Sequence, residues 1–140
     1  MTRRKTWKDS RAKRESGPFV ALPHAVLKSD AFLALSPYAI KLLLDLALQY
    51  RSDNNGDLSA AWKLMKARGW RSEETLNKAK KELLAVGLIA ETRKGGRPNR
   101  TTLYGLTYYT LDPDPKLDVK VASFPQGAWK RWLKEPGPDP

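Results

Sequence analysis

Polar side chains recur along residues 72–86 at spacings of three and four residues, which place them on one face of a helix. The side chains there that could contact DNA bases are Glu74, Asn77, Lys78 and Lys81. An asparagine amide can bond N6 and N7 of adenine, a lysine can reach O6 and N7 of guanine, and a carboxylate can accept from N4 of cytosine. The pattern predicts contacts in a DNA major groove, but a charged outer face is also ordinary for an amphipathic helix.

A second set of polar side chains could hold phosphate groups around this helix. We expect phosphate contacts from Lys63, Lys66, Arg68, Arg71, Ser72, Thr75, Arg93, Lys94, Arg97, Asn99 and Arg100. Residues 93–100 carry four bases and no acid, and mutual repulsion among them costs stability. We therefore predict that this segment lies against phosphates or a narrow minor groove, which attracts arginine. The alternative is a solvated basic loop.

The net charge also favours a polyanionic partner. The chain of 140 residues has 26 Lys and Arg against 15 Asp and Glu, a formal charge of +11. Residues 58–100 hold eleven bases and four acids, and residues 1–18 hold seven bases and two acids. Such concentrated positive charge indicates nucleic acid before membrane, and double-stranded DNA is the expected partner.

Several classes of function lack the residues they need. Cysteine is absent and His24 is the single histidine, so thiolate metal sites and cysteine nucleophiles are excluded. Neither a metal-ligand spacing nor a phosphate-cradling Gly-Lys motif is present, and we expect no enzyme, no metal and no cofactor. No stretch approaches the ~20 apolar residues of a membrane span, and the N-terminus has no apolar core of a secretory signal. The expected location is the bacterial cytoplasm, without a membrane partner.

Apolar spacing predicts the elements that carry these side chains. Helices are expected at 24–33, from Pro37 to Arg51, at 60–68 and at 72–86, and strands at 57–60, 88–94 and 101–109. Ser36 and Ser72 are suitable N-caps. The predicted inner stripes are Ile40, Leu43, Leu44, Ala47 and Leu48, widened by Leu42 and Leu46, and in the later helix Leu76, Ala79, Leu83 and Leu84.

This order of elements predicts an α+β, mainly helical fold of the winged helix-turn-helix type, with a C-terminal β-hairpin as the wing. The domain is expected to span residues 19–111. Residues 1–18 are predicted to form a disordered basic arm, which could lie in a groove or be a solubilising tail. Residues 112–140 hold six of the ten prolines and are predicted to form a flexible tail.

The tail contains a short amphipathic segment with apolar side chains at Trp129, Trp132 and Leu133. These side chains could contact a protein partner or a second copy of the chain, giving a homodimer. They could also dock on the domain of their own chain, which is the interpretation that we favour. A protein-interaction module that acts on a host factor is therefore an alternative to DNA binding.

The stretch from Phe19 to about Leu111 resembles a family of winged-helix proteins from phages, plasmids and integrative elements. The resemblance rests on "LPHAVLKSDAF", "LSPYAIKLLLDL", "NNGDLS" and the run S-x-x-T-L-x-x-A-x-x-E-L-x-x-x-G-L-I from Ser72 to Ile89. It implies double-stranded DNA binding through the helix from Ser72 and the wing from Arg93. Transcriptional regulators and replication initiators share this pattern. We expect a regulator encoded by a mobile element, with an origin-binding initiator as the alternative.

Overall fold

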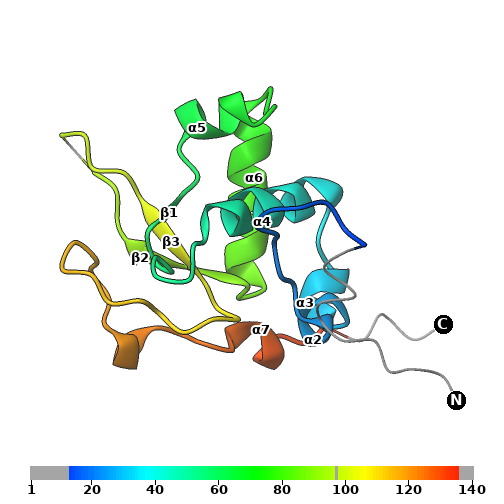
Figure 1. Cartoon of the computed structure of the whole chain (residues 1–140). Coiled ribbons are helices and arrows are strands. Elements are labelled where there is room, and N and C mark those ends of the chain that lie inside the picture. Colours follow the sequence, from blue (N-terminus) through cyan, green and yellow to red (C-terminus); the bar gives the residue numbers. More distant parts are fainter. Residues whose placement is uncertain (1–12, 97, 136–140) are drawn as a thin grey trace, which may run out of the picture.

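A computed structural model describes residues 13–96 and 98–135, and its fold is α+β (Figure 1). The helices in these residues are α2 (His24–Leu27), α3 (Asp30–Leu33), α4 (Pro37–Gln49), α5 (Trp62–Ala67), α6 (Glu73–Ala85) and α7 (Ala128–Arg131), with a 3-10 turn η1 (Val121–Ser123). The strands are β1 (Leu58–Ser59), β2 (Ile89–Arg93) and β3 (Leu103–Leu106). The expected α+β class is confirmed.

Helix α4 begins at a polar cap and buries one face in the core. The Ser36 hydroxyl accepts a hydrogen bond from the Ala39 amide at 3.2 Å, and Pro37 occupies the first turn, where no amide donor is needed. Its buried residues are Ala39, Leu42, Leu43, Asp45, Leu46 and Ala47. The predicted stripe was wrong at Leu44 and Leu48, which are 43% and 54% exposed. The buried face is centred on Leu42, Leu43 and Leu46, so Leu44 and Leu48 lie on the opposite, exposed side of the helix.

The expected single helix over 24–33 is instead two short helices. α2 ends at Leu27, with Lys28 as its C-cap. The Ser29 hydroxyl accepts a hydrogen bond from the Phe32 amide at 3.2 Å, so that Ser29 caps a new helix, α3. Because a capping serine has extended backbone angles, it interrupts the first helix where it starts the second.

Helix α6 packs across α4 through its predicted inner face. Leu76, Ala79 and Leu83 are fully buried, whereas Leu84, also expected inside, is 37% exposed. A carboxylate ties the two helices together, since Glu82 accepts hydrogen bonds from both the amide and the hydroxyl of Ser36, at 2.9 and 2.6 Å. The start of α4 is therefore fixed relative to the last turns of α6.

The three strands form one antiparallel sheet in the order β1-β3-β2. An irregularity between Glu91 and Arg93 interrupts the pairing of β2 with β3 just before the hairpin turns. β3 ends at Leu106, three residues earlier than predicted, and a turn follows it. The buried amide of Asn55 stabilises this end of the sheet, because it bonds the N–H and C=O of Leu106 and the C=O of Thr110.

The segment after Leu111 is part of the same packed body, contrary to the prediction of a separate flexible tail. We call residues 112–133 the strap. The strap runs beneath the sheet from the hairpin to α3 in the view of Figure 1. Phe124 packs against Gly105 so closely that a Cβ there would lie 2.9 Å from its ring, and Trp129 is only 6% exposed. The Gly127 amide also donates to Thr107 O at 2.8 Å. Burial of Phe124 and Trp129 therefore holds the strap on the domain, although its prolines had indicated a flexible tail.

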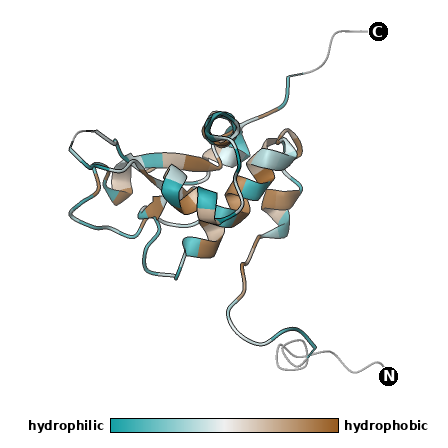
Figure 2. Ribbon diagram, turned by 90° about the horizontal axis from the view of Figure 1, so that it is seen from above, coloured by the Kyte–Doolittle hydropathy of each residue, from teal (hydrophilic) through white to brown (hydrophobic). Residues whose placement is uncertain are grey.

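Hydrophobic residues concentrate where the helices face the sheet, while the outlying loops are mostly hydrophilic (Figure 2). No helix in residues 13–96 and 98–135 is long and apolar enough to cross a membrane. Of the predicted basic arm, residues 1–12 lie outside the described residues, and residues 13–18 are exposed and contain neither helix nor strand.

Candidate nucleic-acid interface

Helix α6 exposes the four side chains that were predicted to approach bases. Glu74, Asn77, Lys78 and Lys81 are all exposed, on the side of α6 away from α4. Ser72 caps the helix by accepting from the Thr75 amide at 3.2 Å, which fixes where the first turn begins. Lys78 lies 3.4 Å from Glu74, and both side chains are largely exposed, at 72% and 80%. Such an exposed pair contributes little to stability and can be exchanged for a contact to DNA.

Lys80 lies at the edge of this face and is half-buried. Desolvation lowers the pKa of its ammonium, while the negative charge of Glu73 acts in the opposite direction. A half-buried lysine is less able to extend into a groove than its exposed neighbours Lys78 and Lys81. The exposed side chains of α6 that remain candidates for base contact are therefore Asn77, Lys78 and Lys81, with Glu74 beside them.

Two arginines organise the hairpin tip, residues 94–102, through bonds to the backbone. Arg93 donates from Nε and Nη2 to Thr101 O, at 3.0 and 2.7 Å, and Arg100 donates from Nε to Lys94 O at 2.9 Å. Gly96 and Arg100 form an isolated β-bridge, and Asn99 adopts φ 55° in the turn. Both guanidinium groups therefore stabilise the conformation of the tip. Arg97, a predicted phosphate contact, lies outside the described residues.

An acid from the strap meets the tip, and the sequence had not indicated it. Asp118 accepts from the Lys94 amide at 3.0 Å and pairs with Arg100 Nη2 at 2.5 Å, while its own amide donates to Thr92 O at 2.8 Å. The Lys94 amide and the Arg100 guanidinium lower the pKa of this carboxyl. Asp118 is 18 residues from Arg100 in sequence, and no local spacing predicts such a contact.

The residues before α6 surround a buried carboxylate. Asp45, 4% exposed, accepts from Trp70 Nε1 at 2.8 Å, Lys41 Nζ at 3.1 Å and Arg68 Nε at 3.1 Å. Burial acts to raise the pKa of Asp45, but the three hydrogen bonds together outweigh it, and the pKa lies below 3.8. Arg68, which was predicted to contact a phosphate, instead donates a hydrogen bond to Asp45 in this structure. Lys63 and Lys66 are exposed, as a phosphate contact requires.

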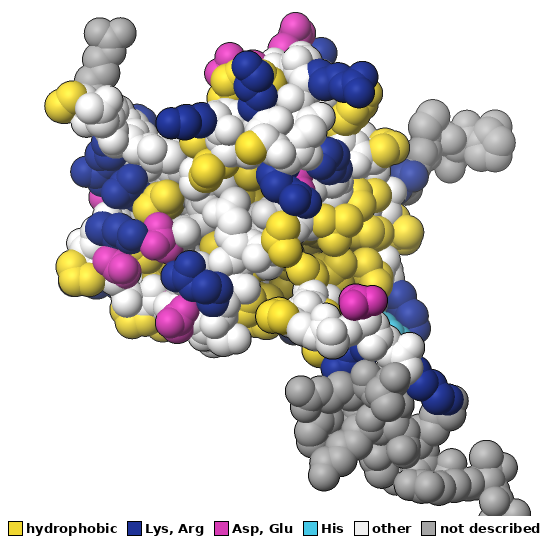
Figure 3. Space-filling model, turned by 45° about the horizontal axis from the view of Figure 1, so that its top comes forward, with side chains coloured by type: hydrophobic (Ala, Val, Ile, Leu, Met, Phe, Trp, Pro, Cys, Tyr) yellow, Lys and Arg dark blue, Asp and Glu magenta, His cyan; other side chains and the backbone are white. Residues whose placement is uncertain are grey.

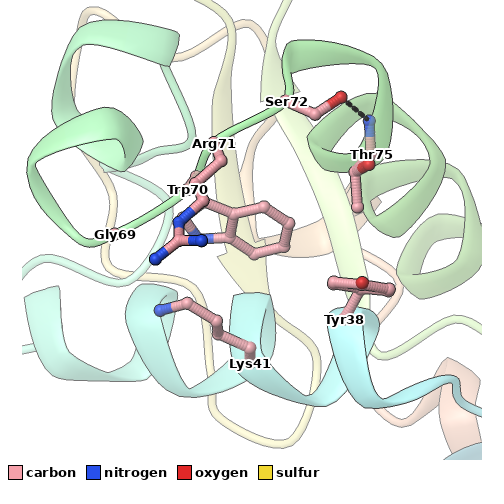
Figure 4. A pocket seen from close by; sticks show the side chains of 7 residues that line it. All are labelled: Tyr38, Lys41, Gly69, Trp70, Arg71, Ser72 and Thr75. Atoms are coloured by element: carbon pink, nitrogen blue, oxygen red, sulfur yellow. Dashed lines mark hydrogen bonds between the residues drawn. The ribbon is translucent and has the colours of Figure 1, made fainter.

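An open pocket of about 410 Å³ lies between α4 and the start of α6 (Figure 4). Its lining residues are Tyr38, Lys41, Gly69, Trp70, Arg71, Ser72 and Thr75. Three of these, Arg71, Ser72 and Thr75, were predicted to contact phosphates, whereas Tyr38 and Lys41 were not. No sequence signal pointed to the latter two, because they belong to the predicted core helix.

The basic side chains are spread over the face on which α5, the start of α6 and the hairpin tip lie (Figure 3). In the same view, hydrophobic side chains form a patch on the right, and some acidic side chains lie among the basic ones. On these elements Lys63, Lys66, Arg71, Lys78, Lys81 and Lys94 are all exposed.

The predicted partner-contact residues are not equally accessible. Trp129 is 6% exposed and belongs to the hydrophobic core, Trp132 is partly buried against that core, and Leu133 is 72% exposed. Trp129 cannot contact a partner unless the strap detaches, so its prediction as a partner contact is corrected. Its burial follows from packing of α7 against α3.

Within residues 13–96 and 98–135, no group of three or more His, Asp or Glu side chains is placed to hold a metal ion. No known protein family, curated protein or solved structure matches this chain significantly.

Proposed function

We propose that this chain is a winged helix-turn-helix protein that binds double-stranded DNA. α5 and α6 would form the helix-turn-helix, and the β2–β3 hairpin would be the wing. The observation that carries the proposal is the exposed face of α6 with Asn77, Lys78 and Lys81, together with the exposed basic residues Lys94 and Arg100 of the hairpin tip. A helix-turn-helix presents its second helix to the major groove with its N-terminal residues leading. The charge distribution suits a duplex, whose phosphates flank the groove.

In this proposal the side chains divide into two roles. Asn77, Lys78 and Lys81 would contact base edges, with Glu74 available to accept from cytosine N4. Lys63, Lys66, Arg71 and Lys94 would hold phosphates, which position the protein without reading sequence. Arg93 and Arg100 would shape the tip and add positive charge to it. The protein would occupy an operator and perform no chemistry there.

Selection of bound sequences from a random duplex library, at about 150 mM salt, tests this function. Enrichment of one motif is expected, and its symmetry would report whether one or two copies bind. Recovery of DNA without a motif would contradict sequence-specific binding, and failure to recover any DNA would contradict DNA binding altogether. A promoter reporter and an origin-dependent plasmid, each carrying the motif, would then distinguish a regulator from a replication initiator.

A protein-interaction module has less support than DNA binding. Its predicted contact surface was Trp129, Trp132 and Leu133, and only Leu133 of these is largely exposed. The chain exposes other apolar side chains, such as Leu44 and Leu48 of α4, but these were not part of that prediction.

A further inference from the structure

We propose that the pocket between α4 and the α5–α6 turn seats one phosphodiester group of the bound DNA, and that Tyr38 and Lys41 of α4 take part in holding it. This inference rests on the proposed function and adds α4 to the interface. It concerns a site that the sequence pattern did not indicate, because α4 reads as a core helix.

The charge around the pocket suits an anion. Lys41 and Arg71 line it, and Arg68, which is not a lining residue, shares the single acid Asp45 with Lys41. That leaves two net positive charges around the Trp70 ring. Glu73 and Glu74, the nearest acids in sequence, are not among the lining residues.

The ammonium of Lys41 is fixed by two hydrogen bonds and has one further N–H donor for a ligand. Its Nζ donates to Asp45 Oδ2 at 3.1 Å and to Arg68 O at 2.9 Å, and it lies 5.6 Å from the Trp70 ring centroid. An ammonium has three N–H donors, so two are used among the described residues and one remains for a ligand. Because Asp45 already fixes the side chain, a phosphate would meet a pre-organised cation, which lowers the entropic cost of binding.

The remaining walls fit a sugar-phosphate unit. In Figure 4 the head groups of Lys41 and Arg71 lie toward one end of the Trp70 ring, and Tyr38 lies toward the other. The rings of Tyr38 and Trp70 are 6.4 Å apart and tilted by 44°, and Tyr38 is 60% exposed with a hydroxyl that can donate. The volume of about 410 Å³ exceeds what a bare phosphate needs, which leaves room for the adjoining deoxyribose between the two rings.

Salt dependence of duplex binding measures the number of phosphate contacts directly. Each contact contributes about 0.9 to the slope of log affinity against log salt. Lys41→Met, which keeps the apolar stem, is expected to reduce the slope by about one, as is Arg71→Gln. Lys28→Met is the matched control, since Lys28 is exposed at the end of α2, far from the pocket. Thermal melts establish that each variant is folded, and Tyr38→Phe provides a milder change that removes the hydroxyl alone.

Neutral methylphosphonate linkages, placed one at a time along the selected duplex, locate the seated phosphate. One linkage should weaken binding of the wild type by about tenfold, the size of a charge-assisted hydrogen bond, and binding of Lys41→Met by less than about twofold. Suppose that the wild type binds DNA, and that Lys41→Met and Tyr38→Phe show the same salt slope and the same response to every linkage as the wild type. This result would overturn the proposed phosphate site in the pocket and leave the proposed function standing.

Inorganic phosphate, added to the free protein, separates the two possible sources of the anion. In a protein that also binds the duplex, we expect phosphate to cause a saturable shift of the Trp70 indole resonance. This shift should be lost in Lys41→Met. The same shift in a protein that binds no duplex would overturn both DNA as the source and the proposed function, and would indicate a soluble phosphate ester instead.

Discussion

The carboxylate of Asp118 and the guanidinium of Arg100 lie 2.5 Å apart, and this ion pair joins the strap to the hairpin tip. The same carboxylate accepts from the Lys94 amide at 3.0 Å, so both sides of the tip are attached to one acid. The positive charge of Arg100 is thus opposed by an acid from outside the hairpin. In a DNA complex, phosphate oxygens would compete with Asp118 for Arg100.

Asp118→Asn should strengthen non-specific duplex binding at low salt and loosen the tip. The change removes the charge that competes with phosphate, and we expect about a two- to fivefold gain in affinity, as for other exposed charge pairs. Fluorescence anisotropy with a random duplex measures the affinity, and hydrogen exchange at the Lys94 amide measures the loosening.

Asp30→Asn provides the control for overall charge. It makes the same formal change at the start of α3, at the other end of the molecule from the hairpin tip (Figure 1). An equal gain in both variants would show that net charge alone is responsible, and would count against a specific role for Asp118.

Lys78→Ala and Asn77→Ala should alter sequence preference. A good base contact contributes about 1–3 kcal/mol of discrimination, so each variant should lose affinity for the selected duplex and retain it for a scrambled one. Lys63→Ala is the comparison, because a phosphate contact should weaken both duplexes alike. Parallel losses on both duplexes in Lys78→Ala would remove Lys78 from base reading.

Asp45 should make the fold sensitive to acid. Its pKa lies below the ordinary 3.8 in the folded protein. A carboxyl whose folded pKa is depressed stabilises the protein above its unfolded pKa, and this stability disappears as the pH falls through the lower folded value. The free energy of unfolding of the wild type should therefore fall below about pH 4 more steeply than that of Asp45→Asn.

Urea denaturation at several pH values checks this. At neutral pH, Asp45→Asn should be less stable by about 1–3 kcal/mol, since Lys41, Arg68 and Trp70 lose a charged acceptor. Identical pH profiles for the two proteins would contradict the assigned role of Asp45.

Trp129→Ala should destabilise the whole domain. Trp129 is 6% exposed in the core cluster, and truncation of a buried tryptophan costs about 3–5 kcal/mol. Leu133→Ala, four residues further along, is the control, because Leu133 is 72% exposed and should change stability little. A wild-type melting temperature for Trp129→Ala would mean that the strap does not pack on the domain in solution.

Elements with local signals could be predicted from the sequence. Ser36 followed by Pro37 marked the start of α4, and Ser72 followed by two glutamates marked the start of α6, because a cap acts within one turn of the chain. The hairpin was predicted from alternation and its glycines, although β3 ends three residues early where Asn55 bonds Leu106. That bond joins residues 51 apart, which no local pattern reveals.

The features that were missed depend on contacts between distant segments. The strap reads as a proline-rich tail until Phe124 and Trp129 are seen against the domain. Asp45 of α4 bonds Arg68 and Trp70, which follow it by 23 and 25 residues in the sequence. No local pattern reveals such contacts, so Arg68 was predicted only as a phosphate contact. The side chains on the outer face of α6 were predicted correctly as exposed, since helical periodicity decides which residues face inward once one face is buried.

Mapping the contact surface by NMR tests the account most directly. Titration of the selected duplex into the labelled protein at about 150 mM salt should shift amides of residues 72–81 and of the hairpin tip, and leave α2, α3 and α7 unaffected. Shifts confined to the strap and α7, or no shifts at all, would contradict binding of DNA through α6 and the hairpin.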